Sequence, residues 1–233
     1  MGTVLLGSPA GLQVLATSRG EFPLHEYRLP LVGREWTLLH AGLILTREDE
    51  LRYFRELLAH LPFGVALWPA AIALAYELAS RAPGLRGGKL LELGAGTGLP
   101  GLVAASLEAS VVQTDRHALT MSVCRRNAQS NGVTGIDYRL VDWTDWQDTE
   151  RYDWIIGSDI LYSEMLHPHL RKIFHANLAP RGRVLISDPL RSPTLRFLES
   201  LEAEGWQVTM TRWDLGDEKG PRTIGVFELS LTS

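Results

Sequence analysis

The stretch Leu90–Gly101, which reads LLELGAGTGLPG, decides the fold of this 233-residue chain. Its apolar run ends at an acidic residue and a turn punctuated by glycines, and a helix-compatible segment follows. That order predicts a strand, a tight loop and a helix, which is where an open α/β sheet binds nucleotide-like ligands. Gly94, Gly96 and Gly98 permit a positive φ, and they let a ligand approach where a Cβ would collide.

The spacing of this loop, and the residue ahead of it, bear on the kind of ligand. A dinucleotide fold would have its third glycine where this chain has Leu99, so that the helix packs closely on the strand and meets a pyrophosphate. Glu92 lies just before the loop, and a carboxylate there suits a cationic ligand better than a diphosphate. S-adenosylmethionine carries an ammonium and a sulfonium group, so the loop favours this cofactor. A nicotinamide-binding loop and an ordinary glycine-rich turn are the alternatives.

Composition places the chain among ordinary soluble proteins, with 45% hydrophobic and 21% charged residues. The net charge of −4 disfavours a broad electrostatic grip on nucleic acid, so we expect no nucleic-acid partner. Cys124, the single cysteine, shares a predicted helix face with Met121 and Ala128, which favours a buried thiol over a nucleophile. The longest apolar stretch, Phe63–Tyr76, is shorter than the ~20 residues of a membrane span, and the start of the chain has no basic leader pattern. We expect a cytoplasmic protein without a membrane partner.

The first part of the chain, residues 1–62, is predicted to be an extension that packs on a main domain formed by residues 63–233. Thr46 and the acidic residues that follow it predict a helix running to about Leu61, and a second helix is expected over Pro69–Ser80. Within the first 45 residues, short β-prone pieces between Gly and Pro predict hairpins at Val4–Leu6, Leu12–Ala16, Tyr27–Val32 and Trp36–Leu39.

From Lys89 onward the patterns of strands and helices alternate, which predicts an α/β fold, a Rossmann-like parallel sheet with helices on both faces. The last two of seven expected strands follow each other without a helix, so the final strand should be antiparallel. The strands are expected at Lys89–Leu93, Ser110–Thr114, Ile136–Val141, Tyr152–Ser158, Arg183–Ser187, Gln207–Arg212 and Thr223–Leu229. The helices are expected near Gly101–Glu108, Ala118–Asn131, Glu164–Asn177 and Pro193–Glu204.

Acidic and aromatic residues follow several of these strands, at the sheet edge where ligands bind. Asp115 ends the second strand, where a carboxylate accepts hydrogen bonds from both ribose hydroxyls of a nucleoside; a helix cap is the alternative. Asp142 and Trp143 follow the third strand, where they would accept from the adenine amine and cover its ring. Trp143 packing a loop beside Trp146 is the alternative. Trp68, which precedes a helix, is expected over the methionine side of the cofactor, or else in a purely structural place.

The fourth strand ends at the topological switch point, where the reacting methyl group should face the substrate. Asp159 and Tyr162 follow it, and they would hold a substrate amine and offer it an aromatic wall. Methyl transfer is an in-line displacement, so alignment matters most, and Asp159 would orient the amine or take its proton. A capping Asp and a packed Tyr are the alternatives. Asp188, after the fifth strand, favours a turn over a substrate contact, and His167-Pro168-His169 lacks the spacing of common zinc sites, so no metal is expected.

Taken together, these segments resemble methyltransferase family sixteen, the lysine and related N-methyltransferases within class I. The glycine run resembles motif I of the seven-strand class, E/D-x-G-x-G-x-G, and the segment from Asp159 to Tyr162 resembles the family's D-x-x-Y signature. The resemblance covers about residues 60–190 and also rests on Trp68-Pro69-Ala70, Thr114-Asp115, the pair Asn127 and Asn131, and Asp142-Trp143.

The resemblance implies S-adenosylmethionine as the cofactor and a protein lysine as the acceptor, with a small-molecule, nicotinamide-like amine as the alternative. It also implies substrate contacts from Asp159 and Tyr162. A nicotinamide-dependent oxidoreductase and a non-catalytic module are the competing classes. The resemblance implies cofactor contacts from Trp68, Glu92, Gly94, Gly96, Asp115, Trp143 and Ser158, and the adjoining Ala95, Thr97, Arg116 and Asp142 complete the expected site.

Overall fold

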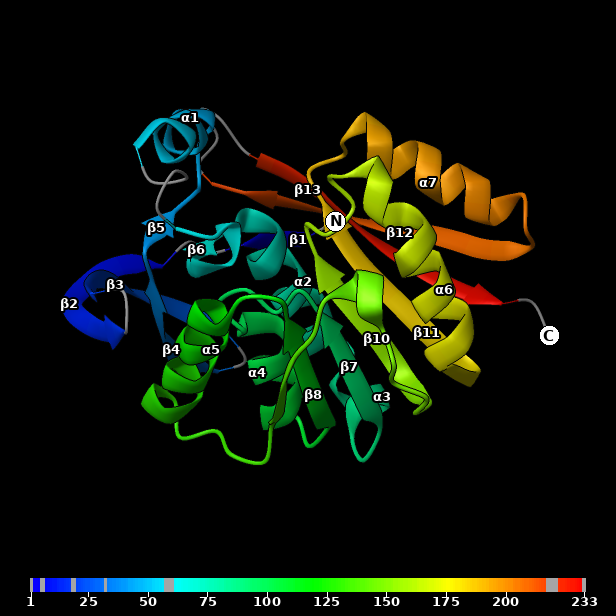
Figure 1. The fold of residues 1–233 in the computed structure, drawn as a ribbon, viewed down its shortest axis with the longest axis horizontal. Coiled ribbons are helices and arrows are strands. Elements are labelled where there is room, and N and C mark those ends of the chain that lie inside the picture. Colours follow the sequence, from blue (N-terminus) through cyan, green and yellow to red (C-terminus); the bar gives the residue numbers. More distant parts are fainter. Residues whose placement is uncertain are drawn as a thin grey trace.

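The computed structural model describes residues 2–4, 7–17, 20–31, 33–56, 61–216 and 222–231. In this described part the centre is an eight-stranded sheet with the order β1-β12-β13-β11-β10-β7-β8-β9 (Figure 1). Strand β13 runs antiparallel to β11 and β12, and the other neighbours are parallel, so the expected reversed last strand is confirmed. The strands are β1 (Gly2–Val4), β7 (Lys89–Leu93), β8 (Ser110–Asp115), β9 (Asp137–Leu140), β10 (Tyr152–Ser158), β11 (Leu178–Asp188), β12 (Trp206–Leu215) and β13 (Arg222–Leu231).

Two features of the sheet differ from the sequence prediction. Strand β11 begins at Leu178, ahead of the expected start at Arg183. The Pro180-Arg181-Gly182 segment has the composition of a turn, but the sheet accommodates it as a shift in register against β10, with Arg181 at φ 66°. The N-terminal strand β1 adds an eighth strand by pairing with the end of β12, and Leu5 and Leu6 of the expected Val4–Leu6 strand lie outside the described residues.

Helices cover both faces of the sheet, as predicted (Figure 1). Side chains alternate along β7, so Leu90 packs with α2 and α4 on one face while Leu91 packs with α6 and α7 on the other. Helix α2 has its expected bounds, since Pro69 is compatible with the first helical turn. The helices are α2 (Pro69–Ser80), α3 (Ala82–Leu85), α4 (Leu99–Ser106), α5 (Ala118–Ser130), α6 (His167–Asn177) and α7 (Ser192–Glu202).

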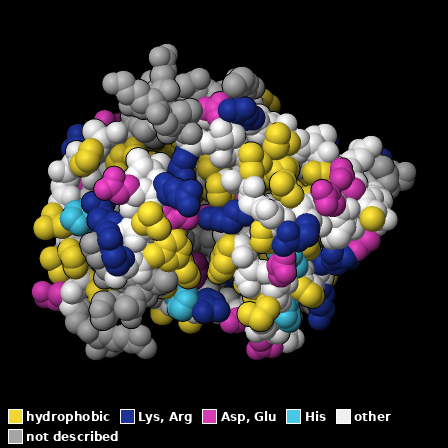
Figure 2. Space-filling model, turned by 90° about the horizontal axis from the view of Figure 1, so that it is seen from above, with side chains coloured by type: hydrophobic (Ala, Val, Ile, Leu, Met, Phe, Trp, Pro, Cys, Tyr) yellow, Lys and Arg dark blue, Asp and Glu magenta, His cyan; other side chains and the backbone are white. Residues whose placement is uncertain are grey.

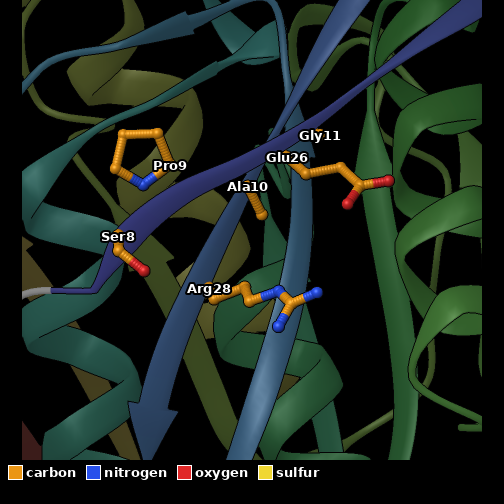
Figure 3. A pocket seen from close by; sticks show the side chains of 6 residues that line it. All are labelled: Ser8, Pro9, Ala10, Gly11, Glu26 and Arg28. Carbon is orange, nitrogen blue, oxygen red and sulfur yellow. The ribbon is translucent and has the colours of Figure 1, made fainter.

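Ahead of the main sheet, the described residues form the three-stranded antiparallel sheet β2 (Ser8–Thr17), β3 (Gly20–Leu31) and β4 (Arg34–His40). Asn127 on α5 joins it to the main sheet, because its Oδ1 accepts from the Leu39 N–H (2.7 Å) and its Nδ2 donates to the Leu39 carbonyl (3.1 Å). A hollow of about 340 Å³ lies on β2 and β3, bordered by residues that include Gly11 and Glu26 (Figure 3).

A short region connects this N-terminal sheet to α2. It contains β5 (Gly42–Leu43), α1 (Arg47–Glu56), the 3₁₀ turn η1 (Phe63–Val65) and β6 (Ala66–Leu67). Thr46 caps α1, since its Oγ1 accepts from the Asp49 N–H at 3.1 Å, and residues 57–60 of the expected longer helix lie outside the described residues. Within the described residues, no helix combines the length and the hydrophobicity needed to cross a bilayer.

Candidate functional site

The glycine loop lies at the carboxyl end of β7 and leads into α4. Gly94, Gly96 and Gly98 have φ values of 64°, 58° and 81°, which confirms the backbone conformation that the sequence predicts. A Cβ at Gly94 would lie 3.1 Å from atoms of both Trp143 and Ile160, and one at Gly96 would lie 3.3 Å from the Gly64 carbonyl oxygen. The loop therefore needs glycine both for its dihedral angles and for the close approach of its neighbours.

Glu92 is fully buried behind this loop rather than facing outward from it. Its Oε2 accepts from the Gly101 N–H on α4 (3.1 Å) and from Gln113 Nε2 on β8 (2.7 Å), and Gln113 Nε2 also donates to the Gly98 carbonyl (2.8 Å). Burial raises the pKa of Glu92 to about 8. Its Oε1 has no hydrogen-bond partner among the described residues. In this position Glu92 and Gln113 fasten the loop to the start of α4, and no pattern in the sequence indicated the role of Gln113.

Asp115 ends β8 beside the glycine loop, as the ribose hypothesis requires. Its Oδ2 accepts from the Gly96 N–H (3.3 Å) and its Oδ1 from the His117 N–H (2.9 Å). A carboxylate offers about four lone-pair positions, so it retains capacity for hydroxyl donors. Burial raises its pKa although these N–H groups oppose the shift. Gly64 of η1 comes close as well, since a Cβ there would lie 3.3 Å from Asp115 Oδ2.

Asp142, Trp143 and Arg116, which also belong to the expected cofactor site, are at least partly exposed. Asp142 is exposed and caps the 3₁₀ turn η2 (Trp143–Asp145), where its Oδ1 accepts from the Thr144 N–H at 2.9 Å, and this bond lowers its pKa. Trp143 is half-buried against Gly94. Arg116 is exposed, and its Nε donates to His117 Nε2 at 3.1 Å.

Three further residues near the loop are mainly internal. Ala95 and Thr97 are buried, and Ser158 is half-buried at the end of β10. Cys124 is buried on α5, where its Sγ donates to the Gly96 carbonyl at 2.9 Å and burial raises its pKa well above the usual value. The predicted buried thiol is confirmed.

An aromatic cluster stands next to the glycine loop, and it includes two residues of the expected site. Phe63 is its centre, with ring centroids 6.3 Å from Trp68, 6.1 Å from Tyr162 and 5.9 Å from Phe54. Trp68 Nε1 donates to the Phe63 carbonyl (3.0 Å), and its ring also contacts Tyr53 of α1. Trp68 is therefore held as part of this cluster. The sequence indicated Trp68 and Tyr162 but not Phe63.

Asp159 follows β10 with a φ of 56°, and its carboxylate is paired with a guanidinium that the sequence did not point to. Arg191, at the start of α7, donates to Asp159 through both Nη atoms, with Nη2 to Oδ2 at 3.2 Å. Asp188 is fully buried and forms the turn that the sequence favoured, since its Oδ1 accepts from the Arg191 N–H (2.7 Å) and its Oδ2 from Thr194 Oγ1 (2.9 Å). His167 contacts the Leu161 carbonyl oxygen at 3.0 Å.

The glycine loop and the segment that begins at Asp159 adjoin each other. Ile160 follows Asp159 and lies close to Gly94, so this segment is next to the glycine loop at the edge shared by β7 and β10. The face seen from above is hollowed near its centre, with hydrophobic, basic and acidic side chains gathered around the hollow (Figure 2). A glycine cradle, a carboxylate with spare acceptor capacity and a neighbouring indole fit a nucleoside cofactor such as S-adenosylmethionine.

The known proteins to which this chain is similar are methyltransferases. The model of a family described as lysine methyltransferase matches residues 46–204. A protein N-lysine methyltransferase, METTL21A of Xenopus tropicalis, is 37% identical over 135 residues, which cover 55% of this chain and 62% of that protein. Its Danio rerio counterpart is 38% identical over 198 residues, covering 82% and 80% of the two chains. The histone-arginine methyltransferase METTL23 of Xenopus laevis is 31% identical over 121 residues, covering 49% and 52%.

The matches with the first curated relatives cover only part of each relative's length. The chain matches only about half to two thirds of the length of the first curated relatives. Among solved structures, a T. thermophilus 16S rRNA N2 G1207 methyltransferase in complex with AdoMet and guanosine superposes with a TM-score of 0.64 at 16% identity, covering 95% of this chain and 58% of that one. At this identity the likeness establishes the methyltransferase fold.

Proposed function

This chain belongs to the lysine methyltransferase family, and from that premise we propose that it transfers a methyl group from S-adenosylmethionine to a lysine side chain of a protein. The observation that carries the proposal is the contact between the glycine loop and the acceptor segment. Ile160, the neighbour of Asp159, lies close to Gly94, so a group held by the loop would lie near a group held by Asp159. The names of the lysine-methylating relatives support the same reaction.

On the cofactor side, each residue contributes a physically distinct interaction. S-adenosylmethionine, when bound, supplies a methyl carbon that is already activated toward nucleophiles. Asp115 would accept from the ribose hydroxyls with the lone pairs that Gly96 and His117 leave unused. Trp143 would cover the adenine ring from its place against Gly94. Glu92 acts from behind the loop, because its bond to Gly101 fixes the start of α4.

On the acceptor side, the residues present suit an amine that arrives as an ammonium ion. The rings of Tyr162 and Phe63 attract a cation through their π faces. Burial raises the pKa of Asp159 to about 6, against the opposing effect of Arg191. Its carboxylate is therefore ionised at neutral pH, and it is a better hydrogen-bond acceptor than an ordinary Asp. We propose that Asp159 orients the amine and receives its proton, directly or through water, before the nitrogen attacks.

The openness of this site favours a macromolecular acceptor over a metabolite. Tyr162 is 49% exposed and Phe63 is 39% exposed, so the aromatic wall is accessible from the surface. A small-molecule site buries most of its ligand, whereas a long lysine side chain on a protein reaches such a surface.

The decisive experiment is methyl transfer with radiolabelled cofactor. Purified protein is incubated with the labelled cofactor and host lysate, next to Asp159→Ala and the control Glu199→Ala, which changes an exposed carboxylate on α7. The wild type and the control should label a discrete protein band that yields methyl-lysine on hydrolysis, and Asp159→Ala should not. Label confined to the small-molecule fraction would refute a protein acceptor, and methylarginine would refute lysine.

A further inference from the structure

Arg191 occupies the centre of an ion cluster that joins distant parts of the chain next to the acceptor residues. Among the described residues, three carboxylates surround its guanidinium: Asp159 after β10, Asp188 at the end of β11 and Glu50 on α1. Its Nη1 lies 3.3 Å from Asp188 Oδ2, and its Nη2 lies 3.9 Å from Glu50 Oε1. Arg222 at the start of β13 binds the other oxygen of Glu50 at 2.5 Å.

The negative charges of this cluster outnumber the positive ones. By formal charge, the three carboxylates face the guanidinium groups of Arg191 and Arg222, which leaves one negative charge in excess among these described residues. One more cation at Asp159 would balance the cluster. The anchors of Arg191 are firm on the side away from Asp159, because Asp188 is fully buried and is itself held by Thr194.

We propose that Arg191 is a positioning residue for methyl transfer, whose guanidinium, anchored by Asp188 and Glu50, holds the Asp159 carboxylate in the orientation and charge state that receive the acceptor amine. This inference rests on the proposed function, since it assigns a task to Asp159. It also gives α1 a part in the acceptor site through Glu50. The paired Nη atoms of Arg191 fix both oxygens of Asp159, which a single-point cation does not do.

This role predicts the direction in which the pKa of Asp159 shifts when a neighbouring charge is removed. The charged groups that act on Asp159 are Arg191, which lowers its pKa, and Asp188 and Glu50, which raise it. Tyr162 also interacts with Asp159 through its charge. Removing Arg191 therefore raises the pKa of Asp159 further and leaves the carboxyl more protonated at pH 7. Removing the charge of Glu50 does the opposite, although Glu50 and Arg191 belong to the same cluster.

The test compares Arg191→Met, Arg191→Lys and Glu50→Gln with the wild type in two measurements. The first is the pH dependence of kcat/KM for methyl transfer, together with the affinity for S-adenosylmethionine. In Arg191→Met the acidic limb should move up by about one pH unit, with roughly a twofold loss at pH 7 and a roughly fivefold or greater loss below pH 6, both recovered at higher pH. Glu50→Gln should move the limb down, and Arg191→Lys should restore part of the wild-type profile. Cofactor affinity should be the same in all four proteins.

The second measurement needs no acceptor, so it separates this inference from the proposed function. Carbon-13 NMR follows the titration of the Asp159 carboxyl, assigned with Asp159→Asn. The midpoint should lie near 6 in the wild type, higher in Arg191→Met and lower in Glu50→Gln. If the wild type transfers no methyl group, the proposed function fails; if the midpoints of Glu50→Gln and Arg191→Met shift in the same direction or not at all, this inference fails. Should Arg191→Met not fold, Arg191→Lys and Glu50→Gln still decide between these outcomes.

Discussion

Replacing Gly101 with alanine tests the buried clamp behind the glycine loop. Gly101 is the third residue of α4, and its N–H donates to Glu92 Oε2 at 3.1 Å. A Cβ at this position would overlap Glu92 Oε2 and would lie 2.6 Å from Gln113 Nε2. Both side chains are fully buried, so neither can move into solvent to make room.

The expected magnitude follows from three contributions to the free energy of unfolding. Overpacking of a tight core costs about 1–3 kcal/mol. Displacing Glu92 from its donors leaves buried polar groups unpaired, at a further cost of about 1–3 kcal/mol. Exchanging glycine for alanine within a helix returns about 1 kcal/mol. We expect Gly101→Ala to be destabilised by about 1–5 kcal/mol, which lowers Tm by roughly 2–20 °C in a chain of this length.

The assay is urea and thermal unfolding, with Gly84→Ala as a matched control. Gly84 is also helical, in α3, but a Cβ there would meet only a Trp154 ring atom at 3.7 Å, an ordinary contact. The control should be unchanged or more stable by up to about 1 kcal/mol. Because the clamp fixes the loop, Gly101→Ala should also lose affinity for S-adenosylmethionine in calorimetry. If Gly101→Ala were as stable as the control and bound the cofactor equally well, the clamp would have no role.

Three further predictions address other parts of the site. Asp115→Ala should lose most of its affinity for S-adenosylmethionine in calorimetry, whereas Asp159→Ala should keep it and lose turnover; normal affinity in Asp115→Ala would exclude the ribose assignment. Burial raises the pKa of Glu92 from 4.5 to about 8 on folding, so its contribution to stability is complete below about pH 4.5 and is lost as pH rises through 8. Urea unfolding between pH 6 and 9 should show this loss in the wild type and not in Glu92→Gln, and parallel pH profiles would contradict the shift. Asn127→Ala leaves three buried backbone groups without their partner and should cost about 2–4 kcal/mol in urea unfolding, while the exposed Ser130→Ala should change nothing.

Local patterns were sufficient to predict most of the central sheet. The β7 strand Lys89–Leu93 and helix α2 have their predicted bounds, because a short apolar run before glycine and a proline at the helix start are signals within a few residues. The reversed β13 followed from the missing helix ahead of it. Strand β11 was predicted too short, because Pro180-Arg181-Gly182 is compatible with a turn and only the neighbouring strand makes it part of the sheet.

Partnerships between distant residues were outside the reach of the sequence. Glu92 was expected to face a cationic ligand, but it is fully buried and accepts from Gln113, which lies 21 residues further along the chain. Asp159 was predicted as an acceptor residue, while Arg191, its partner 32 residues away, gave no pattern of its own. Asp142 was expected to accept from the adenine amine, and in the structure its Oδ1 caps the 3₁₀ turn η2, a local role that was not expected.

The carboxylates at this sheet edge differ in how their charge is compensated, and this difference follows the division between the two halves of the site. Among the described residues Glu92 has N–H donors and no cation at hydrogen-bond distance, and burial raises its pKa to about 8, so the group behind the loop is largely neutral at pH 7. Asp159 is also buried, yet the Arg191 guanidinium opposes that effect, and its pKa of about 6 leaves it ionised at the same pH. A neutral group suits a structural clamp, since it needs no counter-ion in the buried interior. Under the proposed mechanism an ionised group suits an incoming ammonium, and Arg191, which also pairs with Asp188 and Glu50, lowers the pKa of Asp159 and so favours the ionised form.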